Sequence, residues 1–331
     1  MAKVKYADEA IMPDVQYGKH ENRKHGFEHP WEGVGQSIAG QPQEAWAKIA
    51  GLDWELEKQH AFYGPEDGSR CVRIKNRRTW VKKGTDEVFI NQCGLSWEPL
   101  QNRKMLDFVG QYSKAGGVVP EVAGTLKDER IPFVLARINK DIEPAKGDKL
   151  RSYLLFSFPH IVGQSIRIRT YSLRLLCENG MFSTNRATEY QQSHIGTFDF
   201  EAAKERVNQA HKELEEAEKR YKTIMKLKLS IDEAISQVLV PVFEPKLLKD
   251  EKRKNDLANP EVHGKKIEAI VQSIREGAGA TPGTGWGVLN GVTHWADHVA
   301  GKTKATRLFN SLMGDNSRKK AAVEKRLLEL A

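Results

Sequence analysis

The most distinctive chemistry in this sequence is a run of cationic side chains between residues 70 and 83. Arg73, Lys75 and Arg77 are two residues apart, so on a β-strand they share one face. Trp80 lies among them, and the run contains no Asp or Glu. Cations that follow the phosphates, together with a ring that stacks on the bases, are typical of single-stranded nucleic-acid binding. The cations of the run are Arg70, Arg73, Lys75, Arg77, Arg78, Lys82 and Lys83.

A second basic strand is predicted at residues 165–171. Alternation places Arg167, Arg169 and Tyr171 on one face and Ile166 and Ile168 on the other. If the two basic strands lie side by side, they form a cationic sheet or groove in which Trp80 or Tyr171 stacks on bases. The alternative is that Arg and Lys simply occupy solvent-facing strand positions, where they also protect sheet edges from aggregation.

Arg174 follows this strand, and we include it in the predicted nucleic-acid contact surface. Cys177 and Asn179 come next, and a Cys near an Arg can form an activated thiolate. Nucleophilic catalysis also needs a base and a group that orients it, and no such pair is evident in the sequence. We therefore predict no catalytic residue here, and the alternative is a buried Cys beside polar groups that bind loop carbonyls.

Two histidines near the C-terminus have the spacing of metal ligands. His294 and His298 are four residues apart on a predicted helix, and Asp297 is a candidate third ligand. His194 is a further candidate. Trp295 occupies the position where zinc proteases of the HExxH type have their glutamate, and a polar contact between helices explains the same pattern. We expect neither a metal nor an organic cofactor.

Composition limits the other classes. The chain has 331 residues, a net charge of +8, 39% hydrophobic and 29% charged residues, which is too apolar for a wholly disordered chain. Three cysteines without a CxxC pair argue against a disulfide framework or a cysteine zinc site. The polar N-terminal sequence does not resemble a secretory signal, and the longest apolar runs are too short to span a bilayer. We expect a cytoplasmic protein that has no membrane contact.

The order of elements predicts an α+β fold with a mostly antiparallel twisted sheet. Short β-branched and aromatic runs between residues 54 and 93 are separated by turn residues, which predicts an antiparallel meander. A helix is predicted over 102–116, and further strands over 131–139, 152–158 and 165–171. A helix is predicted to begin at 173–179. Residues 1–29, which include His20, His25 and His29, are polar and predict a flexible arm.

A long charged helix is predicted from about residue 198 to residue 229. Its apolar residues follow a 4-3-4-3 spacing, which is typical of a heptad seam. The seam either packs on a neighbouring element of the same chain or joins copies into an oligomer, and we expect the helix to protrude. We divide the chain into an arm at 1–29, an α+β core at 30–197, the long helix with a charged connector at 198–259, and a helical region at 260–331.

Short motifs occur along the chain in a recognisable order. No one of them is specific, whereas the ordered series is. They are PW-x-GVG at 30–35, AGLDW at 50–54, QN at 101–102, E-x-AG-x-L at 121–126, GD at 147–148, YLL at 153–155, R-x-x-C-x-N at 174–179 and G-T-x-W-x-x-x-N-x-V-T-x-W-x-D-H at 283–298.

With these motifs the chain resembles the phage/plasmid-like family, also called the domain-of-unknown-function 932 proteins, over roughly residues 30–330. The resemblance implies a gene carried by phages or plasmids and a fold without an agreed activity. The chain departs from the family pattern at Gly180, where Thr is usual, and at His294 and Trp295, where Glu-Tyr is usual.

The sequence therefore predicts a non-enzymatic nucleic-acid-binding protein of a phage or plasmid. Single-stranded DNA binding or annealing in replication or recombination is the specific expectation, and RNA is not distinguished from DNA. Annealing requires several strands to be held together, so we expect a homo-oligomer and phage or host replication and recombination proteins as partners. The alternatives are a metal-dependent enzyme and an interaction protein that acts on a host factor through the 198–229 helix.

Overall fold

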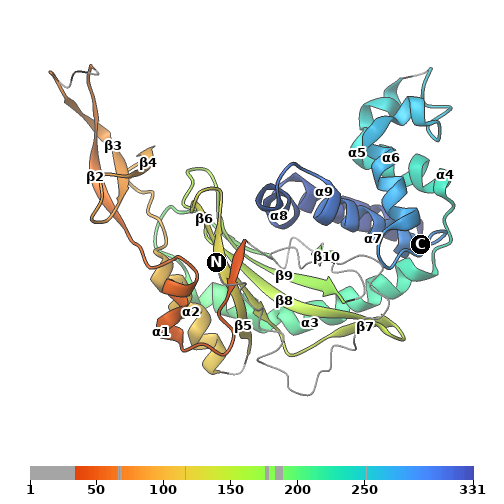
Figure 1. Cartoon of the computed structure of the whole chain (residues 1–331), viewed down its shortest axis with the longest axis horizontal. Coiled ribbons are helices and arrows are strands. Elements are labelled where there is room, and N and C mark those ends of the chain that lie inside the picture. The colour runs from red at the N-terminus through yellow and green to blue at the C-terminus, as the bar shows by residue number, and fades with distance from the viewer. Residues whose placement is uncertain are drawn as a thin grey trace.

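The computed structural model describes residues 34–65, 67, 69–115, 117–175, 179–182, 189–250 and 252–331. It confirms the α+β class: antiparallel sheets combine with helices, and the C-terminal region is helical. A central body carries two projections, one built from strands and the other from helices, and both rise from the same side of it (Figure 1). The predicted arm at 1–29 lies outside the described residues.

The body is built on the larger antiparallel sheet, whose strand order is β1-β5-β6-β8-β9-β10, with β7 on β8 and β11 on β9. The prediction of a helix at 173–179 is wrong, because strand β9 (Ile166–Arg174) continues to Arg174 and pairs with strand β10 (Asn179–Phe182). The strands are β1 (Gly35–Ser37), β5 (Val119–Leu126), β6 (Ile131–Arg137), β7 (Ile142–Ala145), β8 (Asp148–Ser157), β9 (Ile166–Arg174), β10 (Asn179–Phe182) and β11 (Tyr190–Gln192).

Both faces of this sheet are buried, and successive residues along a strand face two different core clusters. On β6 and β8, Val134 and Phe156 face one core cluster, which is shared with helices α2 (Asn102–Lys114) and α3 (Phe200–Lys226). Phe133 and Tyr153 face the other cluster, which helix α8 (Lys304–Leu312) covers with Leu308. The sheet therefore lies between two helical layers. This explains why its central strands are almost continuously apolar.

Helix α3 lies along one face of the sheet. Its seam residues are all buried in the core of the same chain, so the prediction that this helix protrudes is wrong. Because these apolar residues pack within the same chain, they are not available to form a coiled coil with a second copy. The seam consists of Ala203, Val207, Ala210, Leu214, Ala217, Tyr221 and Ile224.

A separate three-stranded sheet confirms the predicted meander. Strands β2 (Leu56–Tyr63), β3 (Val72–Lys82) and β4 (Val88–Cys93) pair antiparallel in the order β2-β3-β4. Its own small core contains Trp80, Phe89 and Trp97 and lies at its base, next to the body. Beyond this core the β2–β3 hairpin projects as a ribbon, which we call the hairpin arm (residues 56–82; Figure 1).

The second projection is helical and is called the helical arm (residues 240–276). It contains α5 (Val240–Phe243), the 3-10 turn at Pro245–Lys249 and α6 (Pro260–Glu276). None of the helices in the described part of the chain combines the length and apolar character needed to cross a membrane. The remaining α-helices are α1 (Gln43–Ile49), α4 (Ile231–Ala234), α7 (Gly285–His294) and α9 (Asp315–Leu330), and π-helical turns follow α4 at Ile235–Leu239 and α7 at Trp295–Val299.

Truncation of the α3 seam tests its intramolecular packing. Leu214→Ala removes a side chain that is 1% exposed and should lower the free energy of unfolding by about 2–5 kcal/mol. Denaturant unfolding measures this, with the exposed neighbour Lys212→Ala as the matched control, which should change stability by less than about 0.5 kcal/mol. If the seam instead joined two copies, the unfolding midpoint would rise with protein concentration.

Candidate nucleic-acid interface

The hairpin arm presents most of the predicted basic run. In its register Phe62 is opposite Arg73 and His60 is opposite Arg78, and the pairing shifts between these two pairs. The shift places Lys75 and Arg77 in a bulged part of β3, so strand alternation alone does not put them on the face of Arg73. Arg73, Lys75 and Arg77 are all exposed.

These cations are not neutralised by the described part of the protein. Among the described residues, no carboxylate lies within ion-pair distance of Arg73, Lys75, Arg77 or Arg78, and the same holds for Arg70. A surface guanidinium in water costs little to leave unpaired. It is therefore available to an external anion such as a phosphate.

Exposed aromatic side chains accompany these cations on the partner strand. Phe62 is 56% exposed and Tyr63 is 63% exposed, and the ring of His60 is 6.5 Å from that of Phe62. The sequence analysis missed these rings because it sought an aromatic only inside the basic run. The signal was present in the segment from His60 to Tyr63, which the meander pairs with that run.

Trp80 does not have the predicted role in base stacking. It is 6% exposed and packs in the small core, with its ring 6.4 Å from that of Trp97. The basic run also ends in structural ion pairs. The Lys82 Nζ atom is 2.8 Å from Glu129 and binds the base of the hairpin arm to the β5–β6 turn, and that of Lys83 is 3.2 Å from Glu55, which directly precedes β2.

The second basic strand is not beside the first, because β3 and β9 belong to different sheets. Strand alternation does group Arg167 and Arg169 as predicted, but helices cover that face. Arg169 Nη1 donates hydrogen bonds to the Leu312 carbonyl at 3.1 Å and the Ser317 hydroxyl at 3.0 Å. Both arginines lie within 3.6 Å of Glu189. The predicted cationic groove of two strands is therefore wrong.

Tyr171 is fully buried in the core cluster under α8, so its predicted stacking on bases is also wrong. The register places it near Gly180 of the neighbouring strand β10. A Cβ atom built at Gly180 would lie only 1.6 Å from the Tyr171 hydroxyl oxygen. The tyrosine ring thus fills the space that a side chain at position 180 would need, which explains why this chain has Gly where the related pattern has Thr.

Arg174 is the centre of a buried ion pair instead of a surface contact. Its guanidinium binds both carboxylate oxygens of Asp148, with Nε at 2.6 Å and Nη2 at 2.8 Å. The indole of Trp286 on α7 donates to the same carboxylate at 3.0 Å, and Arg174 also donates to the Gly279 carbonyl at 2.9 Å. Cys177 lies outside the described residues, as does the side chain of Asn179.

A second buried network holds the base of the hairpin arm. The amide nitrogen of Asn102 donates to the carbonyls of Leu52 at 3.3 Å and Trp54 at 3.2 Å. Its oxygen is therefore left to accept a hydrogen bond from His160 Nε2 at 2.9 Å. Burial, with a smaller effect from His194, lowers the pKa of His160 from 6.5 to about 3, so the ring is neutral at physiological pH.

The residues of the alternative metal site do not form a group of ligands. Asp297 is turned toward Lys320, whose Nζ lies 2.6 Å from it, and also accepts from the Gly180 amide at 2.8 Å. The rings of His294 and His298 lie 5.1 Å apart, while His194 packs on Trp97 near the base of the hairpin arm. The described residues contain no group of three or more metal-ligating side chains.

Residues from motifs far apart in the sequence thus meet in buried networks: Asp148 with Arg174 and Trp286, and Asn102 with the 50–54 segment. The family model for domain of unknown function DUF932 matches residues 91–324. The chain belongs to the DUF932 family. The match begins inside β4, so β2 and β3 lie outside the matched range. No curated protein and no solved structure matches the chain.

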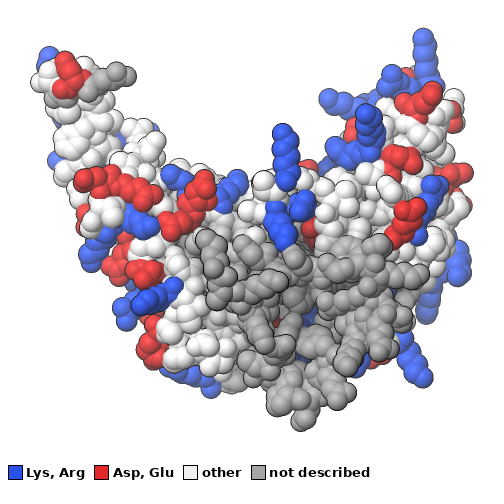
Figure 2. Space-filling model, in the orientation of Figure 1, with Lys and Arg blue, Asp and Glu red and all other residues white. Residues whose placement is uncertain are grey.

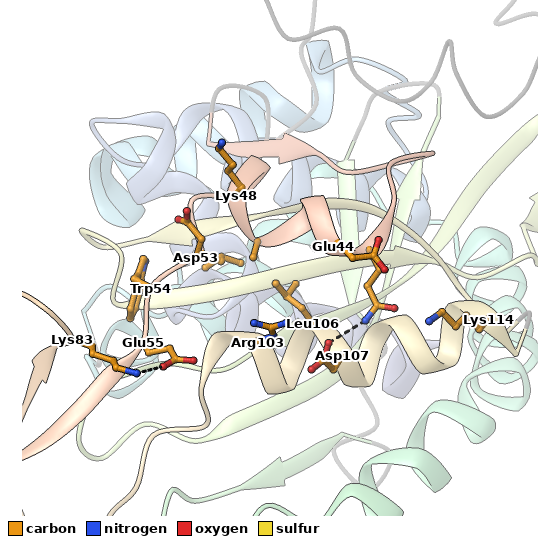
Figure 3. A pocket seen from close by; sticks show the side chains of 13 residues that line it. Glu44, Lys48, Asp53, Trp54, Glu55, Lys83, Arg103, Leu106, Asp107 and Lys114 are labelled. Atoms are coloured by element: carbon orange, nitrogen blue, oxygen red, sulfur yellow. Dashed lines mark hydrogen bonds and ion pairs between the residues drawn. The ribbon is translucent and has the colours of Figure 1, made fainter.

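This DUF932 protein also has a pocket of about 550 Å³ between α1, α2 and the start of β2 (Figure 3). Its rim mixes acidic and basic side chains in equal number, and four of its polar groups form two pairs, Lys83 with Glu55 at 3.2 Å and Gln43 with Asp107 at 3.1 Å. Such a balanced rim selects neither anions nor cations. The unpaired cations and exposed rings of the hairpin arm are therefore the stronger candidate site.

The neutral state of His160 predicts a pH dependence of stability. The folded pKa is below the unfolded value, so this contribution is complete above about pH 6.5 and is lost as the pH falls toward about 3. Between about pH 6.5 and pH 5 the loss should be about 2 kcal/mol. Denaturant unfolding at both pH values should show a smaller loss in His160→Gln, which keeps a donor toward Asn102. An equal loss in the two proteins would contradict this assignment.

Proposed function

We propose that this DUF932 protein binds single-stranded nucleic acid, and single-stranded DNA in particular, along the hairpin arm. Arg73, Lys75 and Arg77 bind the phosphates. Phe62 and Tyr63 take the role in base stacking that the sequence analysis gave to Trp80 and Tyr171. The observation that carries the proposal is the placement of unpaired cations and exposed rings on adjacent strands of one projecting ribbon.

The exposed rings favour a single strand over a duplex. Bases in a duplex are stacked on one another, whereas those of a single strand offer free faces to an aromatic side chain. Phosphate contacts alone would bind both forms by the same electrostatic attraction. Phe62 and Tyr63 supply the part of the binding energy that only a single strand can use.

The wider proposal is a role in annealing during replication or recombination of a phage or plasmid. Annealing brings two strands together, so we expect more than one copy to act at once and phage or host replication and recombination proteins to be partners. The surface that joins copies is not the α3 seam, because those residues pack inside the chain. The hairpin arm of each copy would hold one strand.

Neutralisation of the hairpin arm tests the phosphate contacts. Arg73→Ala combined with Arg77→Ala should weaken binding of a labelled oligothymidine roughly twentyfold at about 0.1 M salt. The slope of log K against log salt should become shallower by about 1.4, because each contact with a single strand contributes about −0.7. Fluorescence anisotropy across a salt series measures both quantities.

Lys104→Ala combined with Lys212→Ala is the matched control, because it removes the same charge from exposed positions outside the hairpin arm. It should leave the affinity and the slope close to those of the unchanged protein. Equal losses in the two double variants would mean that net charge, and not the hairpin arm, governs the interaction. Weak and equal binding of single strand and duplex by the unchanged protein would refute the proposed function.

Removal of the exposed rings tests base stacking separately from charge. Phe62→Ala combined with Tyr63→Ala should cost about 1–3 kcal/mol of binding free energy for each stacked base and leave the salt slope unchanged. Duplex binding should not change. Val88→Ala on strand β4 of the same sheet, which is 45% exposed, is the control for loss of apolar surface. An unaltered single-strand affinity in the ring variant would exclude stacking at these positions.

A further inference from the structure

The helical arm carries a second group of exposed cations. Lys246 and Lys249 lie on the 3-10 turn at Pro245–Lys249, and Lys252 lies in the turn that follows. Among the described residues, no carboxylate lies within ion-pair distance of these three side chains. Nearby cations are paired: Arg253 with Asp250 at 3.5 Å and Lys266 with Glu244 at 3.6 Å. The sequence analysis treated this segment only as a charged connector.

The helical arm is held firmly by the body. Lys319 on α9 donates to the Val242 carbonyl at 2.5 Å, and Arg326 donates to the carbonyl of Gln237, which precedes the arm, at 2.9 Å. The ring of Phe243 also packs edge to face on Trp295, with centroids 5.6 Å apart. The start of the arm is therefore held by the C-terminal helices, and the arm rises opposite the hairpin arm (Figure 1).

A hollow separates the two arms, and Figure 2 shows Lys and Arg side chains on its floor and on the helical arm. Helix α8 lies on this floor (Figure 1), and its start, residues 300–304, contains Lys302 and Lys304 without an acidic residue. Lys127 of the β5–β6 turn lies over the ring of Phe309 on α8, 3.8 Å from its centre. Cations thus occur on both arms and between them.

The helical arm differs from the hairpin arm in one respect that indicates its role. Between residues 245 and 256, Leu248 is the only large apolar side chain of the described residues that is exposed, and none of the exposed residues there is aromatic. This surface therefore supplies charge without base stacking. Such a surface binds the phosphate backbone and does not read the bases.

We propose that the strand bound to the hairpin arm continues across the floor of the hollow, over the start of α8, and onto the helical arm. There Lys246, Lys249 and Lys252 bind its phosphates. This inference rests on the proposed function, since it extends the same bound strand. The hairpin arm then contributes stacking and charge, and the helical arm contributes charge alone. A longer strand gains affinity because it reaches both surfaces.

Strand length tests the inference. An oligothymidine of about 8 nucleotides, within the site size of single-strand-binding domains, should occupy only the hairpin arm, and one about five times longer should reach both arms. The variant Lys246→Ala/Lys249→Ala/Lys252→Ala should bind the short strand as the unchanged protein does. Its affinity for the long strand should fall roughly a hundredfold at about 0.1 M salt, with a slope shallower by about 2. Fluorescence anisotropy, with protein kept limiting, measures the affinity for each of the two strands.

The control is Lys104→Ala/Lys212→Ala/Lys226→Ala, which removes equal charge from exposed positions on α2 and α3. A long strand offers more binding registers to every variant, so only the ratio of long-strand to short-strand affinity is compared. A lower ratio in the helical-arm variant alone supports the inference. An unchanged ratio overturns the inference, even when binding of the short strand upholds the proposed function. If the unchanged protein does not bind the short strand at all, the proposed function itself is refuted.

Discussion

The ion pair between Arg174 and Asp148 is the interaction on which the arrangement of the body depends. Two buried charges are stable only when each is fully paired, because removal of one partner leaves the other desolvated. Here the bidentate contact joins the end of β9 to the start of β8, and Trp286 extends it to α7. The positive φ of 82° at Gly147 lets the β7–β8 turn close directly before Asp148. The ion pair thereby ties α7 to the ends of β8 and β9.

The layer of C-terminal helices determines which cations remain available to a ligand. Arg169 is consumed by contacts to α8 and the start of α9, and Lys320 is buried beside Asp297. Burial lowers the pKa of Lys320, while the Asp297 carboxylate acts in the opposite direction. Basic residues on the covered face of the sheet are thus structural. Cations that have no carboxylate within ion-pair distance in the described part of the chain include those on the two projections, which are exposed to solvent.

The two projections are joined to the body by different means, and this difference suits different roles. The hairpin arm is attached through a small aromatic core, the ion pair of Lys82 with Glu129, and the buried contact of Asn102 with His160. The helical arm is attached through Lys319 and Arg326 of α9. These contacts hold the base of each arm to the body.

The sequence by itself determined the class of fold, the family and the alternation of residues along each strand. Local periodicity predicts a strand or a helix, and alternation correctly grouped Arg167 with Arg169, because these properties depend only on neighbouring residues. The tertiary structure decided which faces are covered. It placed Trp80 and Tyr171 in cores, paired Arg174 with a residue 26 positions away, and left Phe62 and Tyr63 exposed. Burial depends on contacts between distant segments, which local pattern does not encode.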